Sequence, residues 1–150
     1  GCSTQPIFSN FESMEDLQSE VLSSAYHHYF GFLEKEVESG KYPKYKSFGM
    51  AYIRFAKEER ELFKLLFMRD RSEEGMSATS DFEVSVEMIM NANGITREKA
   101  ELMHLEMWVC VHGIATMMAT SFLSWDWEVI SNVLTDVYQG IRTKHVSEDK

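Results

Sequence analysis

Two histidines, His104 and His112, are the residues in this chain whose type and spacing first suggest chemistry. Their separation along a helical pattern places them roughly 80° apart around the axis and about two turns apart. A shared metal ion would then need ligands from another helix, so we expect no metal site. We interpret His112 as a hydrogen-bonded core or pocket residue, whereas His104 could be either, and we expect a pocket role for at least one.

Methionines and aromatic residues surround these histidines. Six of the ten methionines fall between Met88 and Met118, and each one alone is most simply a core residue. As a group they favour a cavity for a small and largely apolar ligand with one or two hydrogen-bonding groups, because methionine adapts to irregular apolar shapes. The residues expected to line it are Tyr52, Phe55, Phe63, Phe67, Met88, His104, Met107, Trp108 and His112.

Catalytic patterns are not found in the sequence. The acidic clusters at 34–38 and 58–61 fit solvated helix faces, and no nucleophile stands in a strand-to-helix turn or a glycine-rich loop. No phosphate-binding loop is present either. We therefore predict a protein that is not an enzyme and has no cofactor.

The first residues form a polar and uncharged amphipathic pattern. Ser3 can cap a short helix with Pro6 in its first turn, and apolar side chains alternate with polar ones at helical spacing. The polar side chains are of the kind that hydrogen-bond to base edges and phosphates. On periodicity alone, an ordinary short helix and connector explains the segment equally well.

Composition favours one all-α domain. The 150 residues are 44% hydrophobic, which suffices for one packed core, and they include only two prolines and eight glycines. Helical patterns span 15–39, 45–57, 62–68, 81–93, 96–123 and 127–144, with a junction at 57–61 and a surface loop at 69–79. The net charge of -9 would repel a phosphate backbone, so most of this chain is not a nucleic-acid surface.

The last two helical patterns carry more apolar surface than one chain of this size can cover. The first is apolar on nearly every side at 107–111, and the second has a continuous apolar stripe. We expect both to pair with their copies in a four-helix bundle of two protomers. The expected interface residues are Ile114, Met118, Phe122, Ile130, Val133, Leu134, Val137 and Tyr138.

The cysteine content and apolar stretches favour the cytoplasm. Cys2 and Cys110 are the only cysteines, and Cys110 lies in an apolar helical pattern where a disulfide would need a coincidence of geometry. No signal peptide pattern opens the chain. The stretch 107–119 is interrupted by His112 and is too short to span a bilayer, so we expect no membrane partner.

The opening segment resembles the end of the DNA-binding domain of TetR/AcrR regulators. The resemblance is carried by Gly1, Ser3, Ile7, Phe8, Phe11, Glu15 and Leu17. Met14 stands where that family usually has a phosphate-contacting lysine, and Phe8 where it usually has a tyrosine. Both departures remove a phosphate contact.

Two further segments resemble one group of TetR-like sensor domains. Trp108, His112 and Gly113 match its Trp-x-x-x-His-Gly signature, and 51–70 is similar to its pair of helices joined at an acidic turn. Arg60 stands there in place of a common proline. The resemblance covers nearly the whole chain.

The resemblance implies a ligand-responsive transcriptional regulator, a repressor, that binds operator DNA as a homodimer. It implies a helix-turn-helix remnant at 1–17 whose first helices are truncated, and a ligand-binding and dimerisation domain at 18–145. Because chain termini are often poorly ordered, we expect a disordered tail at 146–150. In an intact protein the DNA-binding residues would be Ser3, Thr4, Gln5, Pro6, Phe8, Ser9 and Asn10. Without the scaffold helices, we expect this chain not to bind operator DNA.

Two alternatives remain open from the residues. One is a helical small-molecule carrier or protein-interaction domain with no regulatory role, and the other is a helical metalloprotein. Upstream sequence separates the first from a regulator, because a basic segment with two helical patterns ending at Gly1 would indicate a DNA-binding domain. A metal assay would test the second.

Overall fold

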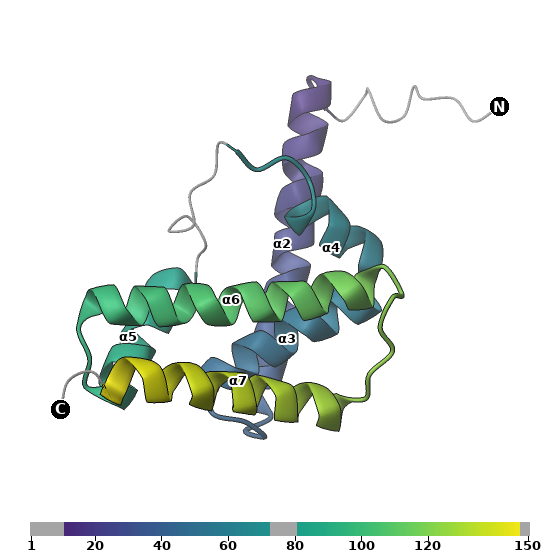
Figure 1. Ribbon diagram of the computed structural model, residues 1–150. Helices are drawn as coiled ribbons and strands as arrows, with labels where there is room; N and C mark the ends of the chain where they lie inside the picture. Colours follow the sequence, from purple (N-terminus) through teal and green to yellow (C-terminus); the bar gives the residue numbers. More distant parts are fainter. Residues whose placement is uncertain (1–10, 73–80, 148–150) are drawn as a thin grey trace.

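The computed structural model describes residues 11–72 and 81–147 (Figure 1). Within these two segments the chain forms helices and no strand, which confirms the all-α class. The helices are α2 (Met14–Glu38), α3 (Lys44–Glu58), α4 (Arg60–Phe67), α5 (Phe82–Asn93), α6 (Arg97–Ala119) and α7 (Trp127–Ser147). The predicted recognition helix lies outside the described residues.

Most helix ends follow from capping residues in the sequence. The side chains of Ser13, Thr96 and Asp126 accept hydrogen bonds from the backbone N–H three residues later, at 3.1, 3.5 and 2.9 Å. Gly94 ends α5 with φ of +65°, a conformation that glycine adopts without strain. Local capping residues therefore set these helix ends.

Helix α6 ends earlier than the periodicity predicts. Ser121 has φ of +60°, the N–H of Phe122 bonds the carbonyl of Met117 at 2.9 Å, and the N–H of Ser121 bonds that of Met118 at 3.1 Å. This pair of bonds is a Schellman motif, in which a left-handed residue closes the helix. Glycine usually occupies this position of the motif. Because a serine stands there instead, no glycine in the sequence indicates that the helix ends at Ala119.

Helix α7 continues into the segment that we expected to be a disordered tail. His145 is buried and its Nε2 lies 2.9 Å from Oε2 of Glu106 on α6. Val146 packs against a small core cluster that contains Val86 and Ile89 of α5. These contacts hold the helix through Ser147, so the prediction for 146 and 147 is wrong.

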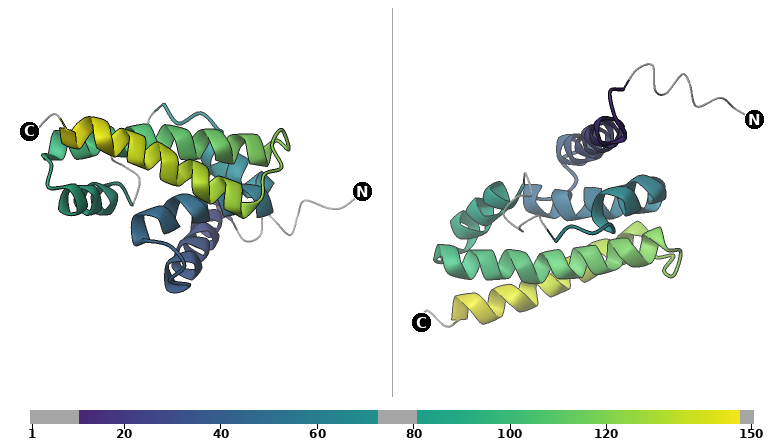
Figure 2. Two further views of the ribbon diagram at one scale, coloured as in Figure 1. Left: turned by 60° about the horizontal axis from the view of Figure 1, so that its bottom comes forward. Right: turned by 90° about the horizontal axis from the view of Figure 1, so that it is seen from above.

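The helices lie in successive layers, with α7 outermost, then α6, then α3, α4 and α5, and finally α2 (Figure 2). Helix α3 contacts each of the other described helices, and α6 contacts α3, α4, α5 and α7. By length and hydropathy alone, the whole of α6 could cross a membrane, although the stretch 107–119 within it is too short to do so. Burial of 44% of its most apolar window inside the protein instead fits the core helix of a globular domain.

Candidate functional site

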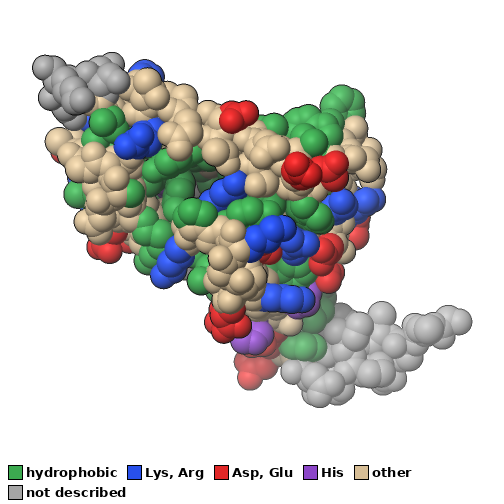
Figure 3. All heavy atoms as spheres, turned by 90° about the horizontal axis from the view of Figure 1, so that it is seen from below, with side chains coloured by type: hydrophobic (Ala, Val, Ile, Leu, Met, Phe, Trp, Pro, Cys, Tyr) green, Lys and Arg blue, Asp and Glu red, His purple; other side chains and the backbone are tan. Residues whose placement is uncertain are grey.

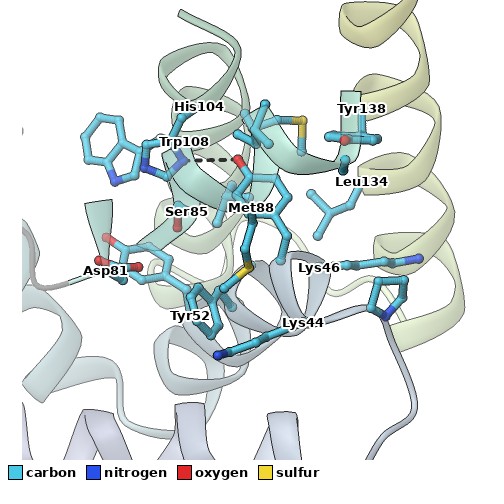
Figure 4. A pocket seen from close by; sticks show the side chains of 18 of the residues that line it. Lys44, Lys46, Tyr52, Asp81, Ser85, Met88, His104, Trp108, Leu134 and Tyr138 are labelled. Atoms are coloured by element: carbon cyan, nitrogen blue, oxygen red, sulfur yellow. Dashed lines mark hydrogen bonds between the residues drawn. The ribbon is translucent and has the colours of Figure 1, made fainter. Parts of the chain in front are cut away.

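A cavity of about 670 Å³ lies among α2, α3, α5, α6 and α7 (Figure 4). Apolar side chains such as Phe48, Ile89 and Leu134 form much of its wall, and a smaller set of polar side chains interrupts them. Of the residues expected from the sequence, the structure brings together Tyr52, Phe67, Met88, His104, Met107 and Trp108 around this cavity. The volume lies within the range of about 300–1,000 Å³ that is usual for small-molecule pockets.

The remaining three expected pocket residues lie outside the cavity wall. Phe55 and Phe63 are fully buried in the aromatic core formed with Tyr52 and Phe67, so they support the wall from behind. His112 lies beside Trp108 on α6 but does not line the cavity. The sequence pattern could not separate these positions because all of them lie on apolar helix faces.

Two tyrosine–histidine pairs connect α3 to α6. The hydroxyl of Tyr45 lies 3.1 Å from Nδ1 of His104, and the hydroxyl of Tyr52 lies 2.9 Å from Nδ1 of His112. Both tyrosines are on one face of α3, seven residues apart, which corresponds to about two helical turns. The two pairs therefore fix the register between the helices that form opposite walls of the cavity.

Burial sets the protonation of both pairs. It raises the pKa of Tyr45 and of Tyr52, and it lowers the pKa of His104 and His112. A neutral imidazole has one acceptor nitrogen, and a neutral phenol has one proton to donate. Where each tyrosine hydroxyl donates to Nδ1, the ring proton of that histidine lies on Nε2.

The Trp-x-x-x-His-Gly segment has a direct structural role in α6. Trp108 stacks on His112 with ring centroids 4.9 Å apart and an interplanar angle of 8°, as the spacing of four residues on a helix allows. Trp108 also lines the cavity, so the stack joins the cavity wall to the Tyr52–His112 bond. A side chain at Gly113 would meet no atom of the described residues within 4 Å.

Charged side chains lie at the margin of the cavity. Lys46 is held by α7, since its Nζ donates to Ser131 Oγ and Thr135 Oγ1 at 2.7 Å each. Lys44 and Asp81 line both the cavity and a shallower groove between α2 and α5, which marks that side as the opening. Hydrophobic side chains gather across the face seen in Figure 3, with lysine and arginine side chains among them.

Several lining residues were missed by the sequence analysis. Tyr26, Tyr29 and Phe30 come from α2, and Tyr45 and Ser85 come from α3 and α5. The spacing of Tyr45 and Tyr52 was a usable signal, because both fall on the apolar face of one helix. Ser85 gave a second signal as a polar residue next to the buried Val86.

The expected interface residues divide into inward and outward positions. Ile114, Met118, Ile130 and Leu134 are buried in the core of a single chain, and so face away from any partner. Val133, Val137 and Tyr138 are half-buried, Tyr138 lines the cavity, and Phe122 is exposed in the α6–α7 loop. A stripe of three or four residues per two turns marks a buried face, but it does not tell whether the same chain or a copy buries it.

Two further expectations concern the DNA-binding residues and metal ions. The predicted DNA-binding residues, Ser3 through Asn10, lie outside the described part of the chain. Within 11–72 and 81–147, no three histidine, cysteine or carboxylate side chains lie close enough together to hold a metal ion.

Comparison with known proteins agrees with this architecture. Residues 45–136, which include α3 to α6, much of α7 and most of the cavity wall, match the family model described as the tetracycline repressor-like C-terminal domain. No curated protein and no solved structure matches the chain. The match spans more than half of the chain, which therefore belongs to the tetracycline repressor-like family through this C-terminal sensor domain.

Proposed function

We propose that the cavity is the effector site of a ligand-responsive, DNA-binding transcriptional regulator, a cytoplasmic repressor. The observation that carries this proposal is the largely apolar cavity of about 670 Å³ with a few polar groups in its wall. Tyr26, Tyr29 and Phe30 of α2 belong to that wall. A ligand in the cavity would therefore touch the helix that leads toward the N-terminal segment.

Helix α2 has the properties of a lever. It is continuous for 25 residues, and its N-terminal half extends beyond the other helices in Figure 1. Met14 and Val21 are 49% and 44% exposed and lie on one side of it with the half-buried Leu17. This uncovered apolar stripe is where DNA-binding helices of an intact regulator would pack.

Regulation would follow from a two-state equilibrium. A ligand that binds one position of α2 more tightly than another shifts the population toward the first position. In a dimer, such a shift changes the spacing of the two DNA-reading segments, which must match two half-sites on the operator. Ligand binding would then weaken the operator complex.

The dimer would form through the outer faces of α6 and α7, nearest the viewer in Figure 1. Leu102, Leu105 and Val109 are 43%, 40% and 58% exposed along one stripe of α6. Gly113 continues this stripe, and Gly140 lies on α7; a Cβ at either would meet no described atom within 4 Å. Small residues on an exposed apolar face allow the backbones of two copies to approach closely.

Native mass spectrometry of the purified protein tests the effector site. We expect a small molecule to remain bound to the wild-type protein through purification, or an added apolar ligand to bind with a stoichiometry of one per protomer. Met88→Trp should fill the cavity and abolish binding, since Met88 projects into it (Figure 4). Met68→Trp, at an exposed position outside the cavity, should bind normally. Equal binding by both variants would contradict the proposed site.

A further inference from the structure

Ser85 presents a buried hydroxyl to the cavity. The residue is 1% exposed, and its Oγ has no hydrogen-bond partner among the described residues. It lines the cavity from α5, next to His104 of α6 (Figure 4). Buried hydroxyl groups are nearly always hydrogen-bonded because burial without a partner is costly. The position of Ser85 therefore points to a partner supplied by the ligand.

His104 supplies a second donor at the same end of the cavity. Its Nδ1 is occupied by the hydroxyl of Tyr45 at 3.1 Å, and that hydroxyl makes no other hydrogen bond within the described residues. With this hydroxyl as the donor to Nδ1, the ring proton of His104 is on Nε2. No acceptor for this N–H is found in the described part of the chain, and the ring lines the cavity.

Together, Ser85 and His104 place two hydrogen-bond donors at one end of a largely apolar cavity, whose wall also carries the charged side chains of Lys44, Lys46, Arg71 and Asp81. A carbonyl oxygen has two lone pairs and can accept from both groups. A carboxylate would lose its hydration against these neutral donors and would lie near the charge of Asp81, whereas an ammonium group could pair with Asp81 but not with the two donors. One competing anchor for an anion, Lys46, is turned toward α7 by its bonds to Ser131 and Thr135 (Figure 4).

We propose that the effector is a neutral carbonyl compound with a hydrophobic body, whose oxygen accepts hydrogen bonds from Ser85 Oγ and His104 Nε2. This inference rests on the proposed role of the cavity as the effector site. The size of the cavity, about 670 Å³, suits an aryl or alkyl ketone, ester or lactone.

Four probes of similar size test the assignment by calorimetric titration: octanophenone, octylbenzene, 4-heptylbenzoate and 1-phenyloctylamine. We expect octanophenone to bind roughly 3- to 10-fold more tightly than octylbenzene, which lacks only the oxygen. The carbonyl stretch of the bound ketone, measured by infrared difference spectroscopy, should lie at a lower frequency than in an apolar solvent.

Ser85→Ala should remove about 3- to 10-fold of the octanophenone affinity, leave octylbenzene binding unchanged and move the carbonyl stretch upward. Thr116→Val is the matched control, since Thr116 Oγ1 is also buried without a partner among the described residues but does not line the cavity. It should change neither measurement.

The outcomes separate the two proposals. Preferred binding of octylbenzene, the carboxylate or the amine, or a ketone affinity that Ser85→Ala leaves unchanged, would overturn the carbonyl assignment while the sensor cavity stands. Failure of all four probes to bind would contradict the sensor cavity as well.

Discussion

Single residues in this domain contribute both to the packing of helices and to the wall of the cavity. The hydroxyl of Tyr52 bonds His112, which stacks on Trp108, and both Tyr52 and Trp108 line the cavity. A ligand that contacts either ring therefore acts on the hydrogen bond between α3 and α6. Such shared use explains why aromatic residues surround one side of the cavity.

Removing the hydroxyl of Tyr52 should destabilise the domain. Tyr52→Phe keeps the ring but deprives Nδ1 of His112 of its donor, at an expected cost of about 0.5–1.5 kcal/mol in the free energy of unfolding. Urea unfolding followed by circular dichroism measures this cost. Tyr42→Phe is the control, because no hydrogen bond of the Tyr42 hydroxyl is found within the described residues. Equal stability of the two variants would contradict the assignment.

Acidification should destabilise the domain through the same histidines. Burial lowers the pKa of His104 and His112 in the folded state, so below the ordinary pKa of about 6.5 the unfolded chain binds more protons than the folded one. The contribution of these two histidines to the free energy of unfolding is complete above that pH, and it falls as the pH decreases toward the folded-state pKa. Its slope is at most about 1.4 kcal/mol per pH unit for each group.

Urea unfolding between pH 7 and pH 5 measures this slope. His104→Asn should reduce this slope. Asparagine places a nitrogen or oxygen near the position that Nδ1 of the histidine occupies, but it does not titrate. A slope identical to that of the wild type would show that His104 does not contribute.

At the scale of helices, close packing of α3 against α6 and α7 sets the shape of the cavity. A Cβ built on Gly49 would lie 3.2 Å from Val111 Cγ2 and 3.4 Å from Leu134 Cδ1. Gly49 therefore lets three helices meet at one point of the wall. A larger residue there would separate the helices that carry the two tyrosine–histidine pairs.

Gly49→Val should lower the free energy of unfolding by about 1–3 kcal/mol, because the added methyl groups overpack the junction. Thermal unfolding measures the loss. Gly31→Ala in α2 is the contrasting variant, since its Cβ would meet nothing within 4 Å, and it should raise stability by about 0.5–1 kcal/mol. A Gly49→Val protein as stable as the wild type would show that the junction tolerates expansion.

Helix positions were largely predictable, whereas the cavity was only partly so. Caps such as Ser13 and Thr96 are local, so sequence alone located these helix starts. The end of α6 at a left-handed serine and the extension of α7 depend on less common or long-range bonds. Ser85 and Tyr45 acquire their roles from opposite helices, and that pairing cannot be derived from periodicity within one helix.

At the scale of the whole molecule, the uncovered apolar stripe on α6 predicts a dimer. Leu105→Glu would place a charge at its middle and should convert the protein to a monomer in light scattering at micromolar concentration. Leu65→Glu, at a similarly exposed site on α4, should leave the dimer intact. A wild-type protein that scatters as a single subunit would contradict this arrangement.

The central claim is that occupancy of the cavity moves α2 within a dimer. Electron–electron double resonance tests it with a spin label on Gln18→Cys near the exposed start of α2, after replacement of Cys2 and Cys110 by serine. We predict a defined distance between the two labels that changes when octanophenone saturates the cavity. An unchanged distance with calorimetrically confirmed occupancy, or no distance between labels at all, would contradict it.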